Sequence, residues 1–145
     1  MMRIFTIGFT KKSAREFFTK LESADVKRIV DVRLRNTSNL AGFTKKDDLK
    51  FFLSRINKID YLHLPELSPT DEILDAYKKK KIDWPEYQVR FNNILSERKI
   101  ENVMRGKLSD GDCLLCSEAT PDKCHRRLVA EYLKRKFKEI NIIHI

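Results

Sequence analysis

Short apolar runs alternate with stretches of helical periodicity along this chain. Five short, strongly apolar runs predict strands, at 3–7, 28–32, 61–64, 112–116 and 141–145. Apolar residues recur at helical spacing between these runs, over about 11–22, 44–56, 70–78, 84–105 and 121–138. This alternation has no linker and no internal repeat, so it predicts a single domain over residues 1–145. We expect a three-layer, Rossmann-like α/β fold with a mainly parallel sheet of about five strands flanked by helices.

Several of the predicted helices begin at a residue that can cap them. Thr10 and Thr70 each precede a helical pattern and can accept a bond from a backbone N–H of the first turn. Thr44 stands in a capping-box pattern before the second helix. Thr120 followed by Pro121 is typical of a helix start, so we expect the last helix to begin at Pro121.

Polar residues and glycine gather directly after the predicted strands. The candidates for substrate or phosphate binding are Gly8, Thr10, Arg33, Ser38, His63, His125 and Arg126. The candidates for catalysis are Asp31, Glu118, Cys116 and Cys124. In open parallel sheets, ligands bind in the crevice beyond the carboxyl ends of the strands. We therefore expect these residues from separate segments to meet at one edge of the sheet.

The charge of the chain narrows the choice of partner. Its net charge is +9, and its pI is near 9.5. Such a basic balance favours a polyanionic partner, and we expect nucleic acid, either DNA, including single-stranded DNA, or RNA. A lysine-rich solubilising surface would explain the same composition.

Cysteine usage and the apolar pattern bear on the cellular compartment. An odd number of cysteines, three, rules out a complete set of internal disulfides. No apolar stretch approaches the roughly 20 residues of a membrane span, and no signal-peptide pattern stands at the start. We expect a cytoplasmic protein without a membrane partner. The charged share of 35% and the single glutamine are typical of proteins from hot environments, where intracellular disulfides also occur.

The segment from Cys116 to Arg127 is the most distinctive in the chain. A helix N-terminus here would bind an anion such as phosphate through its free backbone N–H groups, with His125 and Arg126 as further contacts. The same helix end would favour the thiolate of Cys124, and Cys116 is a second candidate nucleophile. A small buried thiol below a capped helix is the plainer alternative.

The cysteine spacing also raises the question of a metal. Cys113 and Cys116 have Cys-x-x-Cys spacing, and Cys124 with His125 would complete a ligand set. However, residues three apart in a strand point to opposite faces of the sheet. We therefore predict no metal site and no cofactor.

Two carboxylates and a histidine stand at strand ends. Asp31 and Arg33 are two residues apart, so their side chains share a face and can point together into the crevice. Asp31 would then act as an acid or base, and Arg33 would bind phosphate. A structural ion pair that locks the loop is the alternative. Glu118 is the second carboxylate candidate, and His63 ranks below both.

Five segments, taken in order, carry a family resemblance. They are TIGFT at 6–10, DVR at 31–33, Ser38 with the Gly-Phe pair at 42–43, YLHLPEL at 61–67, and the stretch from CSE at 116 to CHR ending at 126. Together they resemble the domain of unknown function 488 family over almost the whole chain. The resemblance implies a small α/β fold and nucleic-acid processing, including excision of damaged pyrimidine bases from DNA. Two places depart from the usual pattern: Thr37 stands for a proline, and Ser68-Pro69 stands for Gly-Gly.

Three functions are open at this point. The first is a nucleic-acid-processing enzyme, a DNA glycosylase and thus a hydrolase, which takes a base into the crevice and uses Asp31 or Glu118. The second is a cysteine-based enzyme or thiol redox sensor that uses Cys116 or Cys124. The third is a non-catalytic nucleic-acid-binding module. Only the first uses the charge, the strand-end residues and the resemblance together.

Overall fold

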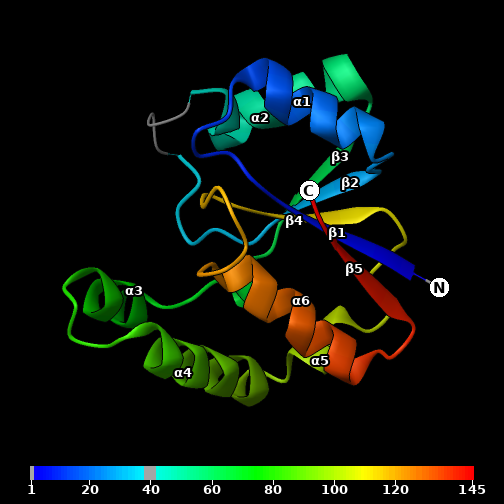
Figure 1. The fold of residues 1–145 in the computed structure, drawn as a ribbon. Helices are drawn as coiled ribbons and strands as arrows, with labels where there is room; N and C mark the ends of the chain where they lie inside the picture. Colours follow the sequence, from blue (N-terminus) through cyan, green and yellow to red (C-terminus); the bar gives the residue numbers. More distant parts are fainter. Residues whose placement is uncertain (1, 38–41) are drawn as a thin grey trace.

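A computed structural model describes residues 2–37 and 42–145 as an α/β fold built on one sheet. The strands are β1 (Met2–Gly8), β2 (Arg28–Asp31), β3 (Asp60–His63), β4 (Asp112–Cys116) and β5 (Ile140–His144). All five are parallel, in the order β3-β2-β4-β1-β5 (Figure 1). The predicted strands are confirmed to within one residue at either end.

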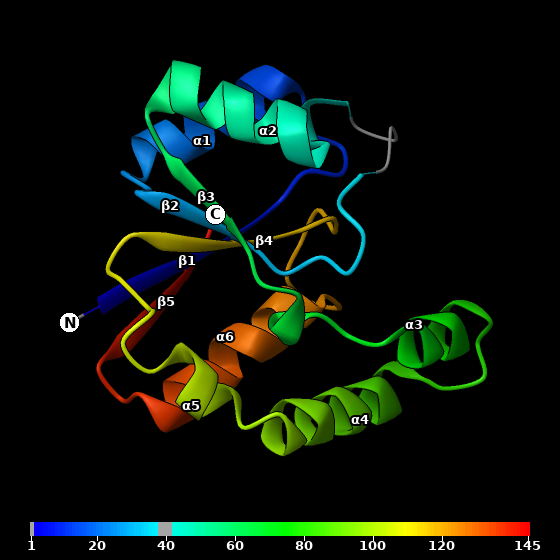
Figure 2. The ribbon, with the colours of Figure 1, turned by 180° about the vertical axis from the view of Figure 1, so that it is seen from behind.

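Helices cover both faces of this sheet (Figures 1 and 2). On one face lie α1 (Ala14–Ser23) and α2 (Lys46–Phe52), which continues as a wider turn over Leu53–Asn57. On the other lie α3 (Asp71–Lys78), α4 (Trp84–Glu97), α5 (Ile100–Met104) and α6 (His125–Lys136). Short 3-10 turns occur at Gly42–Thr44 and Pro65–Leu67. The three-layer prediction is therefore confirmed. Within the described ranges, no helix has both the length and the apolar character that crossing a bilayer requires.

Alternation along the strands divides the core in two. Ile4 faces the α3–α6 side, whereas Phe5 and Ile7 face the α1–α2 side. In β4, Leu114 and Cys116 face the α3–α6 side, and the neighbouring residues face the other. Because a parallel sheet is buried on both faces, its strands are apolar at successive positions. This alternation explains why the predicted strands were recognisable.

The predicted helix over 84–105 is interrupted. Lys99 adopts a left-handed conformation with φ of 53°, so α4 ends before it and α5 begins after it. The preceding Arg98 donates from Nη1 to the carbonyls of Glu66 and Ser68, at 2.7 and 2.6 Å, and ties this corner to the segment after β3. The turn allows Ile100 to enter the core, which a straight helix would not.

Two of the predicted caps near the N-terminal half are wrong. Ser13, not Thr10, caps α1, and its Oγ accepts a bond from the Glu16 N–H at 3.1 Å. Thr44 is buried in a 3-10 turn instead of opening α2. The Thr70 cap of α3 is confirmed.

The predicted start of the last helix is also wrong, and the four-residue shift changes the loop beside the site. We expected it at Pro121, but α6 begins at His125, with Cys124 in the capping position. Residues 117–123 instead form a loop that crosses the end of β1. The Ser117 carbonyl accepts the N–H groups of Phe9 and Thr10, at 3.3 and 2.9 Å, and these bonds hold the loop away from the helix.

Candidate functional site

The carboxyl ends of the strands meet at one edge of the sheet, as predicted. Gly8 at the end of β1 pairs in register with Cys116 at the end of β4. Asp31 at the end of β2 pairs with Leu115 on one side and His63 on the other. A pocket of about 360 Å³ opens at this edge. Its walls come from the segments after β1, β2 and β4, from the start of α6, and from α3 and α4.

Three aromatic rings from α3 and α4 form one wall of the pocket. Trp84 and Tyr87 are stacked, with ring centroids 4.9 Å apart and planes 17° apart. Tyr77 packs against both rings, at 5.8 and 5.2 Å. This aromatic wall offers flat apolar surface at the entrance to a polar site, which suits a planar ring.

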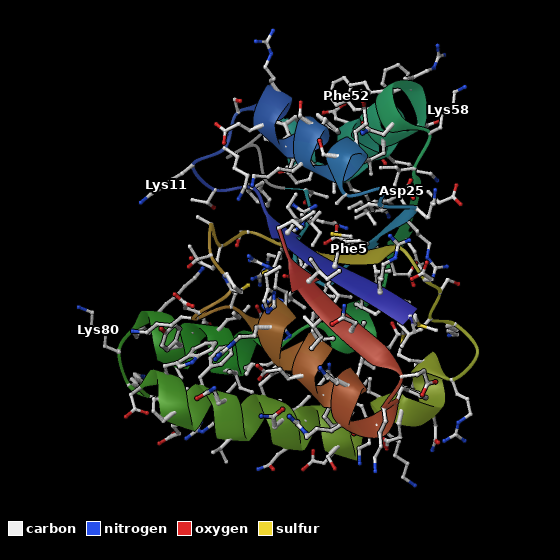
Figure 3. All side chains as sticks on the ribbon, turned by 45° about the vertical axis from the view of Figure 1, so that its right-hand side comes forward. Phe5, Lys11, Asp25, Phe52, Lys58 and Lys80 are labelled. Carbon is white, nitrogen blue, oxygen red and sulfur yellow. The ribbon has the colours of Figure 1, made fainter. Side chains whose placement is uncertain are left out.

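Positive charge surrounds the same opening. Arg35, Lys78 and Lys123 line it. Across 2–37 and 42–145, no ion pair engages Lys78 or Lys123. Farther out, Lys11 and Lys80 extend outward from the elements on either side of the 117–123 loop (Figure 3). These cations give the surroundings of the opening a positive charge.

Asp31 and Arg33 form a closed ion pair at the edge of the pocket. They are 0% and 6% exposed, and the Arg33 Nε and Nη2 each donate to a carboxylate oxygen at 2.9 Å. The backbone N–H of Arg33 and the hydroxyl of Tyr61 also donate to Asp31, at 3.1 and 2.5 Å. Asn36 is a further, longer donor at 3.5 Å. Burial, and then the bond to Asp31, raise the pKa of Tyr61, so its hydroxyl remains a donor. Donors from within the protein thus occupy both oxygens of the Asp31 carboxylate.

The Arg33 guanidinium also has partners other than Asp31 within the protein. Its Nη2 donates to the Thr44 carbonyl at 2.7 Å, and its planar group lies 5.4 Å from the centre of the Phe9 ring. His63 Nε2 lies 2.9 Å from the Arg33 carbonyl and holds the backbone of this loop. Arg33 lines the pocket, but His63 does not. The geometry matches the structural ion pair that the sequence left as an alternative.

Gly8 and Arg126 also have structural positions. A Cβ on Gly8 would lie 1.6 Å from the Glu118 carbonyl oxygen, so only glycine lets the loop cross the end of β1. Arg126 is buried, and its Nη1 donates to that same oxygen at 2.7 Å, while its Nε donates to Thr6 Oγ1 at 3.3 Å. Neither residue lines the pocket, and neither does Thr10. Ser38 lies outside the described residues.

Cys116, Cys124 and His125 form the floor of the pocket. All three are buried and all three line it. Cys116 Sγ lies 3.4 Å from His125 Nδ1, and His125 Nε2 lies 2.7 Å from the Val32 carbonyl oxygen. The two sulfurs and one ring nitrogen all lie within 4.8 Å of one another. This trio is able to perform thiol chemistry or to hold a thiophilic metal ion.

Cys113 takes no part in the floor. It packs with Phe5 and Ile7 on the α1–α2 side of the sheet. The strand-geometry argument that separated Cys113 from Cys116 is therefore correct. Without Cys113, the remaining candidate ligands Cys116, Cys124 and His125 still lie together at the floor.

The surroundings of the two floor cysteines shift their pKa values in opposite directions. A hydrogen bond from Cys124 lowers the pKa of Cys116 against the effect of burial, and the Arg126 charge acts in the same direction. The bond with Cys116, and then burial, raise the pKa of Cys124. Burial lowers the pKa of His125 and favours the neutral form of its ring. Cys116 is consequently the more acidic thiol of the pair.

A family model described as "Domain of unknown function DUF488" matches residues 13–133 of the chain. The chain belongs to this family. No curated protein and no solved structure matches it.

The DUF488 match extends from the cap of α1 to α6 and includes the pocket floor. The segment at 6–10, which we compared with the family above, precedes it. Pro69, from the Ser68-Pro69 pair, lines the pocket.

The sequence indicated the contribution of α3 and α4 only weakly. Lys78 belongs to a run of lysines that reads as a solvated surface, and Trp84 and Tyr87 fit a helix core. Their weak common signal was the closeness of aromatic residues to lysines. Only the fold brings these helices to the edge where the strands end.

Proposed function

We propose that this protein is an enzyme that processes nucleic acid by taking one unstacked base into the pocket. The supporting observation is the composition of the pocket: the aromatic wall, the cations around its opening and one unpaired carboxylate. The aromatic wall stacks on the base, and Arg35, Lys78 and Lys123 hold the flanking phosphates. A volume of about 360 Å³ is within the usual range for sites that bind small molecules.

Glu118 is the acid–base residue of this proposal. It lines the pocket, and within the described ranges no ion pair engages its carboxylate. Asp31 lacks this freedom because Arg33 and Tyr61 occupy its oxygens. The role that the sequence offered to either carboxylate therefore passes to Glu118, and Asp31 positions the loop.

The reaction is hydrolysis of the bond between a damaged pyrimidine and its deoxyribose. Glu118 accepts a proton from water as the water oxygen bonds to C1′ of the sugar. The C1′–N bond breaks, the electron pair leaves with the base, and the base is then protonated. The products are a free base and an abasic site.

The test is base release from labelled oligonucleotides. Single- and double-stranded DNA carrying uracil or 5-hydroxyuracil is incubated with the protein, treated with alkali and sized on a gel. We expect cleavage at the lesion by the wild type, loss of cleavage in Glu118→Gln, and unchanged cleavage in Glu139→Gln. Glu139 is a suitable control because it is exposed and precedes β5 at the opposite edge of the sheet. Salt-sensitive binding without release would reject the hydrolase, and no binding would reject nucleic acid as the partner.

Thiol chemistry is the second candidate, favoured by the lowered pKa of Cys116 at the pocket floor. In this alternative the Cys116 thiolate displaces a leaving group from an electrophilic substrate, and water then hydrolyses the covalent intermediate and releases the thiol. Cys124 supports the thiolate through its hydrogen bond. Replacing Cys116 or Cys124 with alanine should then abolish turnover, and Glu118→Gln should not. The base-release reaction predicts that Glu118→Gln is the more damaging change.

A further inference from the structure

We infer that Cys116, Cys124 and His125 bind a zinc-class divalent ion, with a fourth coordination position open to the pocket. Two thiolates and one imidazole are ligands that zinc prefers over magnesium or calcium. The inference stands on the geometry of the floor and does not depend on the proposed reaction.

The distances between the ligand atoms suit one shared ion. A sulfur and a nitrogen bound to the same tetrahedral zinc lie about 3.6 Å apart, from bond lengths of about 2.3 and 2.0–2.1 Å. Cys116 Sγ lies 3.4 Å from His125 Nδ1. Two sulfurs on one zinc lie about 3.8 Å apart. Since all three ligand atoms lie within 4.8 Å of one another, closure of about 1 Å or less completes the site.

The backbone prepares the histidine for this role. Cys116 Sγ is 3.4 Å from Nδ1 and 3.7 Å from Nε2, so distance alone separates the two nitrogens little. The Val32 carbonyl decides between them, because it accepts the Nε2 proton at 2.7 Å and leaves the lone pair on Nδ1. Metal-binding histidines commonly donate their other N–H to a carbonyl or carboxylate in this way. Phe91 also contacts the ring edge-on, with centroids 5.7 Å apart, and restricts its rotation.

Three ligands leave one position free, and that position faces the pocket. Cys113 cannot supply a fourth ligand because it packs on the other side of the sheet. Among the described residues, the group that gathers here contains these three members and no carboxylate. Three protein ligands with an open position are typical of catalytic zinc, whereas structural zinc takes four. The open position would hold water or a donor atom of the pocket ligand.

Charge is also balanced at the loaded site. Two thiolates offset a divalent ion, so a buried site needs no further acidic residue. Arg126 keeps its bonds to the Glu118 carbonyl and to Thr6, because none of the three ligand atoms takes part in them.

The test measures metal binding directly, on reduced full-length protein freed of metal with a chelator. Cobalt is added first, since thiolate coordination gives a strong near-ultraviolet charge-transfer band. Zinc affinity then follows from competition with a chromophoric chelator. We expect one ion per chain. We also expect Cys116→Ala and Cys124→Ala each to weaken zinc by at least about 100-fold.

Cys113→Ala is the matched control, because Cys113 is equally buried and lies on the same strand as Cys116. It should bind zinc as tightly as the wild type. Circular dichroism shows whether each variant is folded. A readout without variants is alkylation of the folded wild type with and without zinc, followed by quenching of the reagent and mapping of the labelled cysteines. Bound zinc should protect Cys116 and Cys124 from the thiol reagent, and should not change labelling of Cys113.

Three results would overturn the inference: no binding at micromolar metal, a cobalt spectrum without the thiolate band, or equal loss of zinc in Cys113→Ala. Release of a base by the metal-free protein would leave the metal site intact as a finding and separate it from that reaction. Tight zinc binding without base release would support the metal site and reject the proposed reaction.

Discussion

Two buried polar groups lie at the same edge of the sheet, and they differ in what faces them. Asp31 and Arg33 direct their polar atoms at each other, at Tyr61 and at the Thr44 carbonyl. The other group, Cys116, Cys124 and His125, directs its sulfur atoms toward a pocket. The first group holds the loop after β2 in place. The second group presents two thiols and an imidazole to the pocket. Polar residues at strand ends therefore mark an edge without showing which of them act.

The two groups also differ in how much stability the protein loses when one member is removed. A buried ion pair is costly to break because the partner left behind keeps its charge away from water. The pocket floor contains neutral or mutually bonded groups, whose loss leaves no isolated charge. Substitutions in the first group should change stability, and those at the pocket should change ligand binding.

The largest effect should come from removing one half of the closed ion pair. Arg33→Ala leaves the Asp31 carboxylate buried with no cation, and we expect the free energy of unfolding to fall by about 3–5 kcal/mol. Denaturant unfolding measures this. The control is Arg35→Ala, whose ion pair with Asp71 is 69% and 58% exposed and should contribute under about 1 kcal/mol. Equal losses in the two variants would contradict the comparison.

The next effect concerns the loop that forms the rim above the pocket floor. Gly8→Ala places a methyl group 1.6 Å from the Glu118 carbonyl oxygen, so the loop must move. We expect a loss of about 1–3 kcal/mol in unfolding free energy, typical of overpacking. Gly42→Ala is the matched control, because a methyl group there meets nothing within 4 Å. If Gly8→Ala is as stable as Gly42→Ala, the crossing of the loop is not tight.

The aromatic wall should affect binding and leave folding largely unchanged. Trp84 is half-buried and stacks on Tyr87 at the pocket. Under the proposed function, Trp84→Ala should weaken single-stranded DNA binding by about 1–3 kcal/mol, the usual value of one base stacked on an aromatic ring. Fluorescence anisotropy at fixed salt measures it. Val89→Ala, an exposed apolar position on the same helix, should bind as the wild type does.

The smallest effect belongs to an exposed ion pair at the opposite edge. Arg3 lowers the pKa of Asp110 from its usual 3.8 to about 2. A carboxylate with a lowered folded pKa stabilises the fold above its unfolded pKa, and this contribution disappears as the pH falls from 3.8 toward 2. Asp110→Asn should flatten the dependence of unfolding free energy on pH in that window. An unchanged slope, measured by denaturant titration at constant ionic strength, would show that solvent screens the pair completely.

The sheet was predictable because its signal is local. Alternate residues of a buried parallel strand face two cores, and both must be apolar, so each strand reads as a short apolar run. The gathering of polar residues at one edge followed from topology alone. The separation of Cys113 from Cys116 followed from strand geometry.

The details of the site depend on contacts between distant segments. The Tyr61 hydroxyl donates to Asp31 from another strand, and nothing near Asp31 in the sequence indicates that bond. The start of α6 moved from Pro121 to His125 because the loop before it bonds to the residues after β1. A cap pattern is a local preference, and tertiary hydrogen bonds outweighed it.

The position of β1 in the sheet has a consequence for how the chain reaches its fold. β1 is synthesised before the other four strands, yet its two neighbours are the last two: Ile4 pairs with Asp112, and Met2 pairs with Ile140. At usual rates of synthesis, more than 100 residues correspond to roughly 5–20 seconds of waiting. During that time an apolar segment has no partner strand and is exposed to chaperones or to aggregation. The pocket, whose rim rests on the end of β1, therefore forms only after β4 and the start of α6 have been made.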